Sequence, residues 1–313
     1  MNQQLETPIT FIIFKRPDTT AKVFETIRQV KPKKLYVIAD GPRIDREGEA
    51  EKCAETRAII EQVDWNCEVI KNYSEVNLGC AKRVSSGLDW VFNQVEETII
   101  LEDDCIPHQT FFRFCEKLLE KYRYDNRITS IAAQNAQLRQ KRTDYSYYFS
   151  SYSHCWGWAS WRRAWQHYDL HIKLWQEVKE SNILNNILVD SKAVSYWTNI
   201  FNSIYENPTG ITWDYQWTFA CWMQGGLNII PNVNLVSNVG VGADSTNFNS
   251  NQEFSFINLP TEEMEFPLKH PPYIVRNLPA DKFIQDTVYR ATKLDLFKQN
   301  LKKILQDRKV IAR

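Results

Sequence analysis

Residues 99–104, Ile-Ile-Leu-Glu-Asp-Asp, decide how the rest of this chain is interpreted. Three consecutive apolar residues predict a short buried strand, and three carboxylates follow it directly. Adjacent carboxylates repel one another unless a cation compensates them. In open parallel sheets, ligands bind just beyond the carboxyl ends of the strands. The stretch therefore predicts either a cation-dependent site or a solvated acidic turn that leads into the next helix.

Strand and helix patterns alternate around this stretch through the first 135 residues. Strands are expected at residues 9–14, 35–38, 67–70, 98–101 and 128–133. Helices are expected at residues 18–30, 45–63, 78–95 and 108–122, with Asp18 as the N-cap of the first. Short apolar strands that alternate with helices predict an α/β fold with a mostly parallel sheet, flanked by helices on both faces.

The second half of the chain has a different pattern. Residues 136–160 are polar and aromatic without a clear period, and residues 231–280 are expected to be loops. Short helices are expected at residues 161–168, 175–188, 191–205 and 213–224, a strand at 227–230, and a helical end at 281–313. This half also carries many of the 11 Trp and 14 Tyr residues. Such side chains suit a core or a surface that stacks on sugars.

Composition excludes several classes of protein. Lys plus Arg and Asp plus Glu both number 38 among 313 residues, so no basic excess suggests a nucleic-acid partner. The seven cysteines are odd in number and never spaced as Cys-x-x-Cys, which argues against a zinc cage or a disulfide framework. Residues 1–10 lack the pattern of a secretory signal. These features predict a cytoplasmic protein.

Residues 99–112, IILEDDCIPHQTFF, resemble the metal-binding segment of nucleotide-sugar glycosyltransferases of the GT-A fold. The resemblance is to bacterial family-2-like members and to the Glu-Asp-Asp form of the Golgi N-acetylglucosaminyltransferase that initiates complex N-glycans. It implies a Rossmann-like sheet, with Mn²⁺ or Mg²⁺ bound by Asp104. Glu102 and Asp103 would contact the donor. A single carboxylate, completed by phosphate oxygens and water, is a common way to hold such a cation.

Three further segments resemble the nucleotide-binding half of that family. Arg16 follows the first strand and would lie near the base or the diphosphate. Asp40, with Arg43 beside it, would contact the base or the ribose. Lys82 or Arg83 would meet the diphosphate at a helix N-terminus. Taken alone, each segment also fits an ordinary turn or helix start.

The aromatic half supplies the expected sugar pocket. Residues 156–158 resemble a Trp-Gly-Trp segment of bacterial relatives, so Trp156 and Trp158 are predicted to line the pocket together with Trp213. Gly157 would let the backbone approach the donor sugar. The alternative is that these tryptophans only fill the core.

Two acidic residues complete the expected site. Asp214 occupies the place of the general base in inverting relatives. Its alternative role is a favourable charge in the first turn of a helix that Thr212 caps. Asp244 is expected to contact the ligand or to build a glycine-rich turn. Asn247 stands where relatives often carry a histidine, which leaves Asp104 as the metal ligand.

The carboxyl-terminal residues 290–313 contain eight basic and two acidic side chains with apolar residues at helical spacing. Such a helix lies on the inner face of an anionic membrane or packs on its own domain. We therefore expect a catalytic domain at residues 1–280, with a nucleotide-binding half at 1–135 and an acceptor half at 136–280. Residues 281–313 would form an amphipathic tail.

The expected function is metal-dependent, inverting transfer of a sugar from a nucleoside-diphosphate sugar, a UDP-sugar in the first place, to a hydroxyl of a glycan or another acceptor. A sugar nucleotidyltransferase is one alternative, although the chain lacks a Gly-rich loop after the first strand. A non-catalytic carbohydrate-binding protein is the other.

Overall fold

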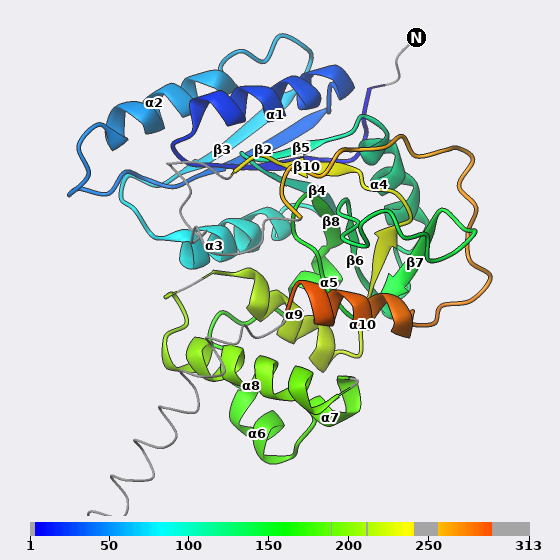
Figure 1. Cartoon of the computed structure of the whole chain (residues 1–313). Coiled ribbons are helices and arrows are strands. Elements are labelled where there is room, and N and C mark those ends of the chain that lie inside the picture. The colour runs from blue at the N-terminus through cyan, green and yellow to red at the C-terminus, as the bar shows by residue number, and fades with distance from the viewer. Residues whose placement is uncertain (1–3, 189, 211, 241–255, 290–313) are drawn as a thin grey trace, which may run out of the picture.

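The computed structural model describes residues 4–188, 190–210, 212–240 and 256–289. These residues form an α/β fold around an eight-stranded, mostly parallel sheet with the order β3-β2-β1-β4-β8-β6-β9-β7 (Figure 1). Its strands are β1 (Ile9–Ile13), β2 (Lys34–Ala39), β3 (Glu68–Tyr73), β4 (Glu97–Glu102), β6 (Ile128–Ala132), β7 (Tyr147–Ser150), β8 (Trp158–Trp161) and β9 (Leu227–Pro231). A two-stranded sheet joins β5 (Cys105–Pro107) to β10 (Val236–Asn238).

The helices cover both faces of the large sheet, as expected. They are α1 (Pro17–Val30), α2 (Glu49–Ile60), α3 (Cys80–Phe92), α4 (Thr110–Lys121), α5 (Arg162–Trp165), α6 (Trp175–Glu180), α7 (Leu184–Ile187), α8 (Ser191–Glu206), α9 (Asp214–Met223) and α10 (Leu278–Thr287). In Figure 1, α1 and α2 lie over one face and α3 lies on the other, above a lobe that contains α5 to α9. The fold is Rossmann-like.

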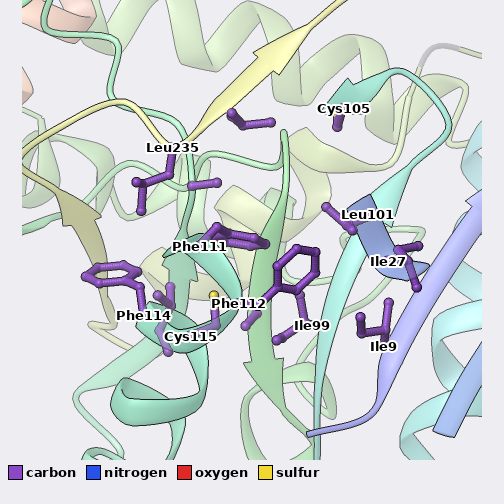
Figure 2. Close-up of a cluster of buried hydrophobic side chains, with 14 of the residues drawn as sticks. Ile9, Ile27, Ile99, Leu101, Cys105, Phe111, Phe112, Phe114, Cys115 and Leu235 are labelled. Atoms are coloured by element: carbon purple, nitrogen blue, oxygen red, sulfur yellow. The ribbon is translucent and has the colours of Figure 1, made fainter. Parts of the chain in front are cut away.

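Alternate side chains of the central strands enter two separate cores. Ile99 and Leu101 of β4 pack with Phe111 and Phe112 of α4, as Figure 2 shows. Ile100, between them, faces the opposite core, which contains residues of α3 and four tryptophans of the second half: Trp158, Trp165, Trp213 and Trp217. Because both faces are buried here, Ile99, Ile100 and Leu101 are all apolar, and this part of the strand shows no alternation in sequence.

The sheet is not parallel throughout. β1, β2, β3 and β4 pair in parallel, and so do β6 and β9. β8 inserts antiparallel between β4 and β6, and β7 pairs antiparallel with β9 at the edge. Strand β7 and the first three residues of β8 lie within residues 136–160, where no strand is expected from the sequence, and Trp161 ends β8 where a helix is expected to begin. Three other local expectations are wrong. Arg16, not Asp18, is the N-cap of α1, and residues 175–188 form two helices. Residues 231–280, expected to be loops, contain strand β10, which pairs with β5.

Helix α10 is docked on the sheet by its own buried side chains. The carboxylate of Asp281 accepts hydrogen bonds from the Ser150 and Ser151 hydroxyls at 2.5 and 2.7 Å. Gln285 Oε1 accepts one from Trp197 Nε1 at 2.9 Å, which joins α10 to α8. The division expected at residue 280 thus falls inside a helix that packs on the core. Residues 290–313, expected to contact a membrane, lie outside the described residues. Within the described part of the chain, no helix is long and apolar enough to cross a membrane.

Candidate active site

The three carboxylates lie where β4 leaves the sheet. Glu102 is the last residue of β4, and Asp103 and Asp104 form the turn into β5. Strand β10 pairs antiparallel with β5, and Asn238 pairs with Cys105. The chain beyond β10 is therefore brought against the acidic turn. The carboxyl ends of β1 and β4 meet here, because Ile12 pairs with Glu102 in the parallel register.

Arg16 bridges two of the three carboxylates. Its Nη2 donates to Asp103 Oδ1 at 2.6 Å, and its Nη1 lies 2.9 Å from Asp104 Oδ2. The backbone N–H of Phe14 donates to the second oxygen of Asp103 at 3.0 Å. Both oxygens of Asp103 thus accept hydrogen bonds from the segment that connects β1 to α1.

Asp104 is less fully engaged and lies beneath the chain that follows β10. Its Oδ1 lies 3.3 Å from Cys105 Sγ and 3.5 Å from Asn238 Nδ2, both of which donate. Its backbone carbonyl accepts from Val239 N at 2.9 Å. A Cβ placed on Gly240 would lie 2.0 Å from Asp104 Oδ2. Only a glycine allows the backbone to pass this close to the carboxylate.

The cluster carries more negative charge than its single guanidinium balances. Burial raises the pKa of Glu102 well above its usual range, and Asp104 and Asp103 raise it further. Burial likewise raises the pKa of Asp103 to about 6, although Arg16 opposes the shift. Burial alone would lower the pKa of Arg16, but the two aspartates outweigh it and raise that pKa above its ordinary value.

The donor set fits a hard divalent cation that is bound through one protein carboxylate. Carboxylate oxygens are the ligands that Mg²⁺ and Mn²⁺ prefer, and an added cation would relieve the excess negative charge. Asp104 is the candidate, since both oxygens of Asp103 accept N–H donors at 3.0 and 2.6 Å, whereas Oδ1 of Asp104 has only the longer contacts with Cys105 and Asn238. Among the described residues, no group of three or more His, Cys, Asp or Glu side chains could hold a metal by itself. The remaining ligands would have to come from substrate and water.

Asp214 lies within electrostatic reach of the acidic turn. It is the first residue of α9, and its carboxylate accepts from Thr212 Oγ1 at 2.7 Å. Burial raises the pKa of Asp214, and its charge adds to the raised pKa of Glu102. The N-cap of α9 is Trp213, so the expected capping role of Thr212 is wrong. Thr212 instead orients the Asp214 carboxylate.

Asp40 is used within the fold. Its Oδ1 accepts from the N–H groups of Gly41 and Leu78, both at 2.9 Å. Its Oδ2 accepts from Gly79 N at 3.0 Å and from Asn77 Nδ2 at 3.1 Å. The carboxylate thereby fixes the turn that opens α3, where Gly79 has a φ of +79°. Contact between Asp40 and a nucleotide stays a prediction, since four internal donors already use its oxygens.

Arg43 and Lys15 share a buried carboxylate. Glu49 accepts from Arg43 Nε at 3.0 Å and lies 2.8 Å from Lys15 Nζ. Burial would raise the pKa of Glu49, but the bonds from Arg43 and Lys15 lower it to about 2. The two cations also lie 6.0 and 5.6 Å from the centre of the Phe14 ring. Sequence reasoning missed both Phe14 and Glu49.

The two basic residues at the start of α3 have different environments. Arg83 is buried, and its Nη2 donates to the carbonyl and the side chain of Asn72 at 2.6 and 2.7 Å. Lys82 is exposed. Arg83 therefore holds Asn72 of β3 and is not exposed to a ligand, whereas Lys82 is the cation that an incoming diphosphate could reach.

The tryptophans divide between core and surface. Trp158 and Trp213 are only 1% and 2% exposed, and their rings stack at 5.5 Å and 25°. The expectation that they line a sugar pocket is wrong, because their faces are covered by other rings. Trp156 is partly exposed, and Gly157 has a φ of +64° with Ala133 Cβ 3.2 Å from where its own Cβ would lie. Trp156 remains the candidate for contact with a sugar.

Three further residues belong to the expected site or lie near it. Asp244 and Asn247 lie outside the described residues. Cys155 is a neighbour that the sequence did not identify. Burial raises the pKa of its thiol well above the ordinary value, and Asp214 and Glu102 raise it further. Cys155 therefore lies within electrostatic reach of both acidic parts of the site.

Comparison with known proteins gives only distant structural likeness. No family model matches the chain, and no curated protein matches it. A UDP-glucose pyrophosphorylase complexed with UDP-glucose is 12% identical with a TM-score of 0.26, over 46% of this chain and 62% of that one. The 4-diphosphocytidyl-2C-methyl-D-erythritol synthase of Anaerococcus prevotii is 12% identical with a TM-score of 0.31, over 66% of this chain and 86% of that one. HddC of Yersinia pseudotuberculosis complexed with GMP-PN is 8% identical with a TM-score of 0.27, over 46% and 60%.

The chain spans about three fifths of the length of the pyrophosphorylase and of HddC. Likenesses this low do not bear on the reaction, so any functional assignment has to rest on the geometry of the site.

Proposed function

We propose that this protein is a metal-dependent glycosyltransferase that moves a sugar from a nucleoside-diphosphate sugar to an acceptor hydroxyl. One observation carries the proposal. A buried, under-compensated carboxylate turn follows a central parallel strand, and a second carboxyl, the partly buried Asp214, lies within its electrostatic reach. A site with these two parts can hold a charged donor at one and accept a proton at the other.

The donor would be bound between the acidic turn and the start of α3. The N-terminus of this helix has no side-chain cap, and a helix N-terminus favours an anion. Lys82 adds a positive charge there. Arg16 lies at the other side and would hold the diphosphate while it stays paired with Asp103. Asp40 acts as a positioning residue, because its four hydrogen bonds hold the turn before α3.

The transfer itself would be a single displacement. The acceptor oxygen forms a bond to the anomeric carbon while the bond from that carbon to the diphosphate oxygen breaks. Asp214 takes the proton of the acceptor hydroxyl, and Thr212 holds its carboxylate in place. A divalent cation held on Asp104 would supply positive charge for the departing diphosphate. No covalent sugar–enzyme bond is needed, so the configuration at the anomeric carbon would invert.

The connection between β1 and α1 argues against the nucleotidyltransferase alternative. Only residues 14–16, Phe-Lys-Arg, join the two elements, and none of them is glycine. A loop that wraps the phosphates of a nucleoside triphosphate needs glycines that let its backbone approach closely. A non-catalytic sugar-binding protein would have no use for the carboxylate turn.

A donor screen tests the proposal. The protein is incubated with a panel of nucleoside-diphosphate sugars and Mn²⁺, and release of nucleoside diphosphate is measured with and without EDTA. We expect release from one donor class that stops when the metal is chelated. Parallel reactions contain nucleoside triphosphates and sugar 1-phosphates. Pyrophosphate release from those, without release from any sugar donor, would establish a nucleotidyltransferase instead.

A further inference from the structure

A cavity lies at the β7 edge of the sheet, away from the acidic turn. Its volume is about 490 Å³, within the range of small-molecule sites. Several residues of the segment 271–279 line one side of it, and this segment is held to β7 because Phe149 bridges to Arg276 and its carbonyl accepts from Asn277 N at 2.8 Å. The lining residues are Lys141, Arg142, Thr143, Tyr147, Tyr148, Phe149, Pro271, Tyr273, Val275, Arg276, Asn277, Leu278 and Pro279.

This cavity is separate from the proposed donor site. Strand β7 is four places from β4 in the sheet, with β8, β6 and β9 between them. At about 4.8 Å for each neighbouring pair, the two sites are roughly 19 Å apart. No residue of the acidic turn lines the cavity.

The rim of the cavity is aromatic and apolar. Tyr273 is 54% exposed, and the ring of Tyr145 stands edge-on to it with centroids 6.1 Å apart. Val275 and Leu278 are also exposed on the same segment. Tyr148 is buried at the inner side. A fixed, exposed tyrosine beside a cavity provides an apolar face on which the C–H groups of a sugar ring can pack.

The charged groups at the cavity leave one cation unbalanced. None of the described residues that line it is acidic. Lys141 Nζ pairs with Asp144 at 3.0 Å, and Arg276 Nε pairs with the buried Asp281 at 2.5 Å. Arg142 has no carboxylate partner among the described residues.

The guanidinium of Arg142 is nonetheless held in place. Its Nε donates to Gln137 Oε1 at 2.5 Å, and the group lies 5.1 Å from the centre of the Phe283 ring. Its two Nη groups make no hydrogen bond to a described residue. A positioned fork of free N–H donors is the arrangement that recognises a carboxylate or a phosphate.

We propose that this cavity binds an acidic saccharide, meaning a sugar that carries a carboxylate or a phosphate. Arg142 contacts the acidic group, and Tyr273 packs against the ring that bears it. The volume admits one or two sugar rings and excludes a folded partner. The proposal does not depend on the transferase reaction, because a site for an acidic sugar would stand even if no donor were hydrolysed.

The test is ligand-observed NMR on the full chain with a disaccharide of two uronic acids and its neutral counterpart. A sugar 1-phosphate and inorganic phosphate serve as further probes. We expect the uronic disaccharide and the sugar phosphate to bind, and the neutral sugar to bind about tenfold more weakly or not at all. UDP with Mn²⁺ is expected not to displace the uronic disaccharide.

Substitutions of two residues that line the cavity test whether the saccharide binds there. Tyr273→Ala should weaken binding about two- to tenfold, and Arg142→Gln about tenfold or more. Tyr124→Ala removes another exposed tyrosine, and Arg113→Gln removes another arginine that lies over a ring, that of Phe266 at 4.2 Å. Both controls should bind like wild type.

Three results would overturn the proposal. The first is that neither acidic sugar binds, and the second is that acidic and neutral sugars bind equally. The third is that Arg142→Gln and Tyr273→Ala, shown by circular dichroism to be folded, bind as well as wild type. Binding of inorganic phosphate alone, without either acidic sugar, also counts against it, because the sugar ring would then contribute nothing.

Discussion

Gly240 lies so close to Asp104 that a methyl group on its Cα would stand 2.0 Å from the carboxylate oxygen Oδ2 and 2.9 Å from Arg16 Nη1. The chain that follows β10 therefore touches the proposed metal ligand through bare backbone. This contact joins the last strand of the fold to the acidic turn after β4. It gives position 240 a direct influence on the geometry of Asp104.

Gly240→Ala should accordingly disturb the site. Relief of the overlap must move either Asp104 or the backbone, so we expect the free energy of unfolding to fall by about 1–3 kcal/mol. The affinity for UDP in the presence of the metal should fall as well, because Asp104 is the proposed metal ligand. Urea unfolding and calorimetry measure the two effects. In the Asp104→Ala background the carboxylate is gone, and the same substitution should cost much less stability. Equal costs in the two backgrounds would show that the overlap is relieved elsewhere.

Truncation of a buried tryptophan and of a partly exposed one should have different effects. Trp213→Ala removes a buried ring stacked on Trp158 and should lower the free energy of unfolding by about 3–5 kcal/mol. Trp156→Ala removes a partly exposed ring, and we expect a smaller stability loss together with a raised KM for the donor sugar. Urea unfolding and donor kinetics separate the two effects. A Trp156→Ala enzyme with unchanged KM would remove this residue from the sugar pocket.

Glu49 should make stability depend on pH below neutrality. Its carboxylate has a folded-state pKa lowered to about 2 from an ordinary 4.5, so its contribution is full above the ordinary value. That contribution disappears as the pH falls from about 4.5 towards 2. The shift corresponds to about 3 kcal/mol, which Glu49→Gln should remove at pH 7.

Urea unfolding at several pH values measures this effect. The curve of Glu49→Gln should be flatter than that of wild type between pH 5 and the acid limit. Glu47→Gln alters an exposed carboxylate two residues away and serves as the control. Parallel curves for wild type and Glu49→Gln would show that the bonds from Arg43 and Lys15 do not stabilise the fold.

Asp214→Asn tests the proposed base. The variant should lose about 10²–10⁴-fold in kcat and keep its affinity for UDP, because the base does not touch the nucleotide. In wild type the rate should fall as the pH drops through the pKa of Asp214, which burial raises above the ordinary value. The variant should show no such limb. If the variant retains full kcat, or if the product retains its anomeric configuration, Asp214 is not the base.

Several parts of the fold follow from local patterns. The strands around residues 9–14 and 98–101 are predictable because each is a short, nearly continuous apolar run. The helix that begins at Pro17 is predictable because its buried residues recur at helical spacing. Strand β8 is not predictable in this way. Its sequence Trp-Ala-Ser-Trp is buried on both faces, and its position between β4 and β6 depends on long-range pairing.

The site shows the same division between local and long-range information. The acidic turn is identified by the carboxylates that follow an apolar strand. The hydrogen-bond partners of Asp40 cannot be identified in this way, since Leu78 and Gly79 lie 38 and 39 residues away in the sequence. The burial of Trp158 against Trp213 also depends on packing between distant segments. No local sequence pattern distinguishes a tryptophan that fills a core from one that lines a sugar pocket.

Calorimetric titration of UDP in the presence of Mn²⁺ tests the central claim most directly. Wild type should bind UDP much more tightly with Mn²⁺ than with EDTA, and Asp104→Asn should lose that metal-dependent gain. Asp45→Asn, which changes an exposed aspartate outside the turn, should bind like wild type. If Asp104→Asn binds UDP as tightly as wild type in Mn²⁺, the acidic turn is not the metal-dependent donor site and the account is wrong.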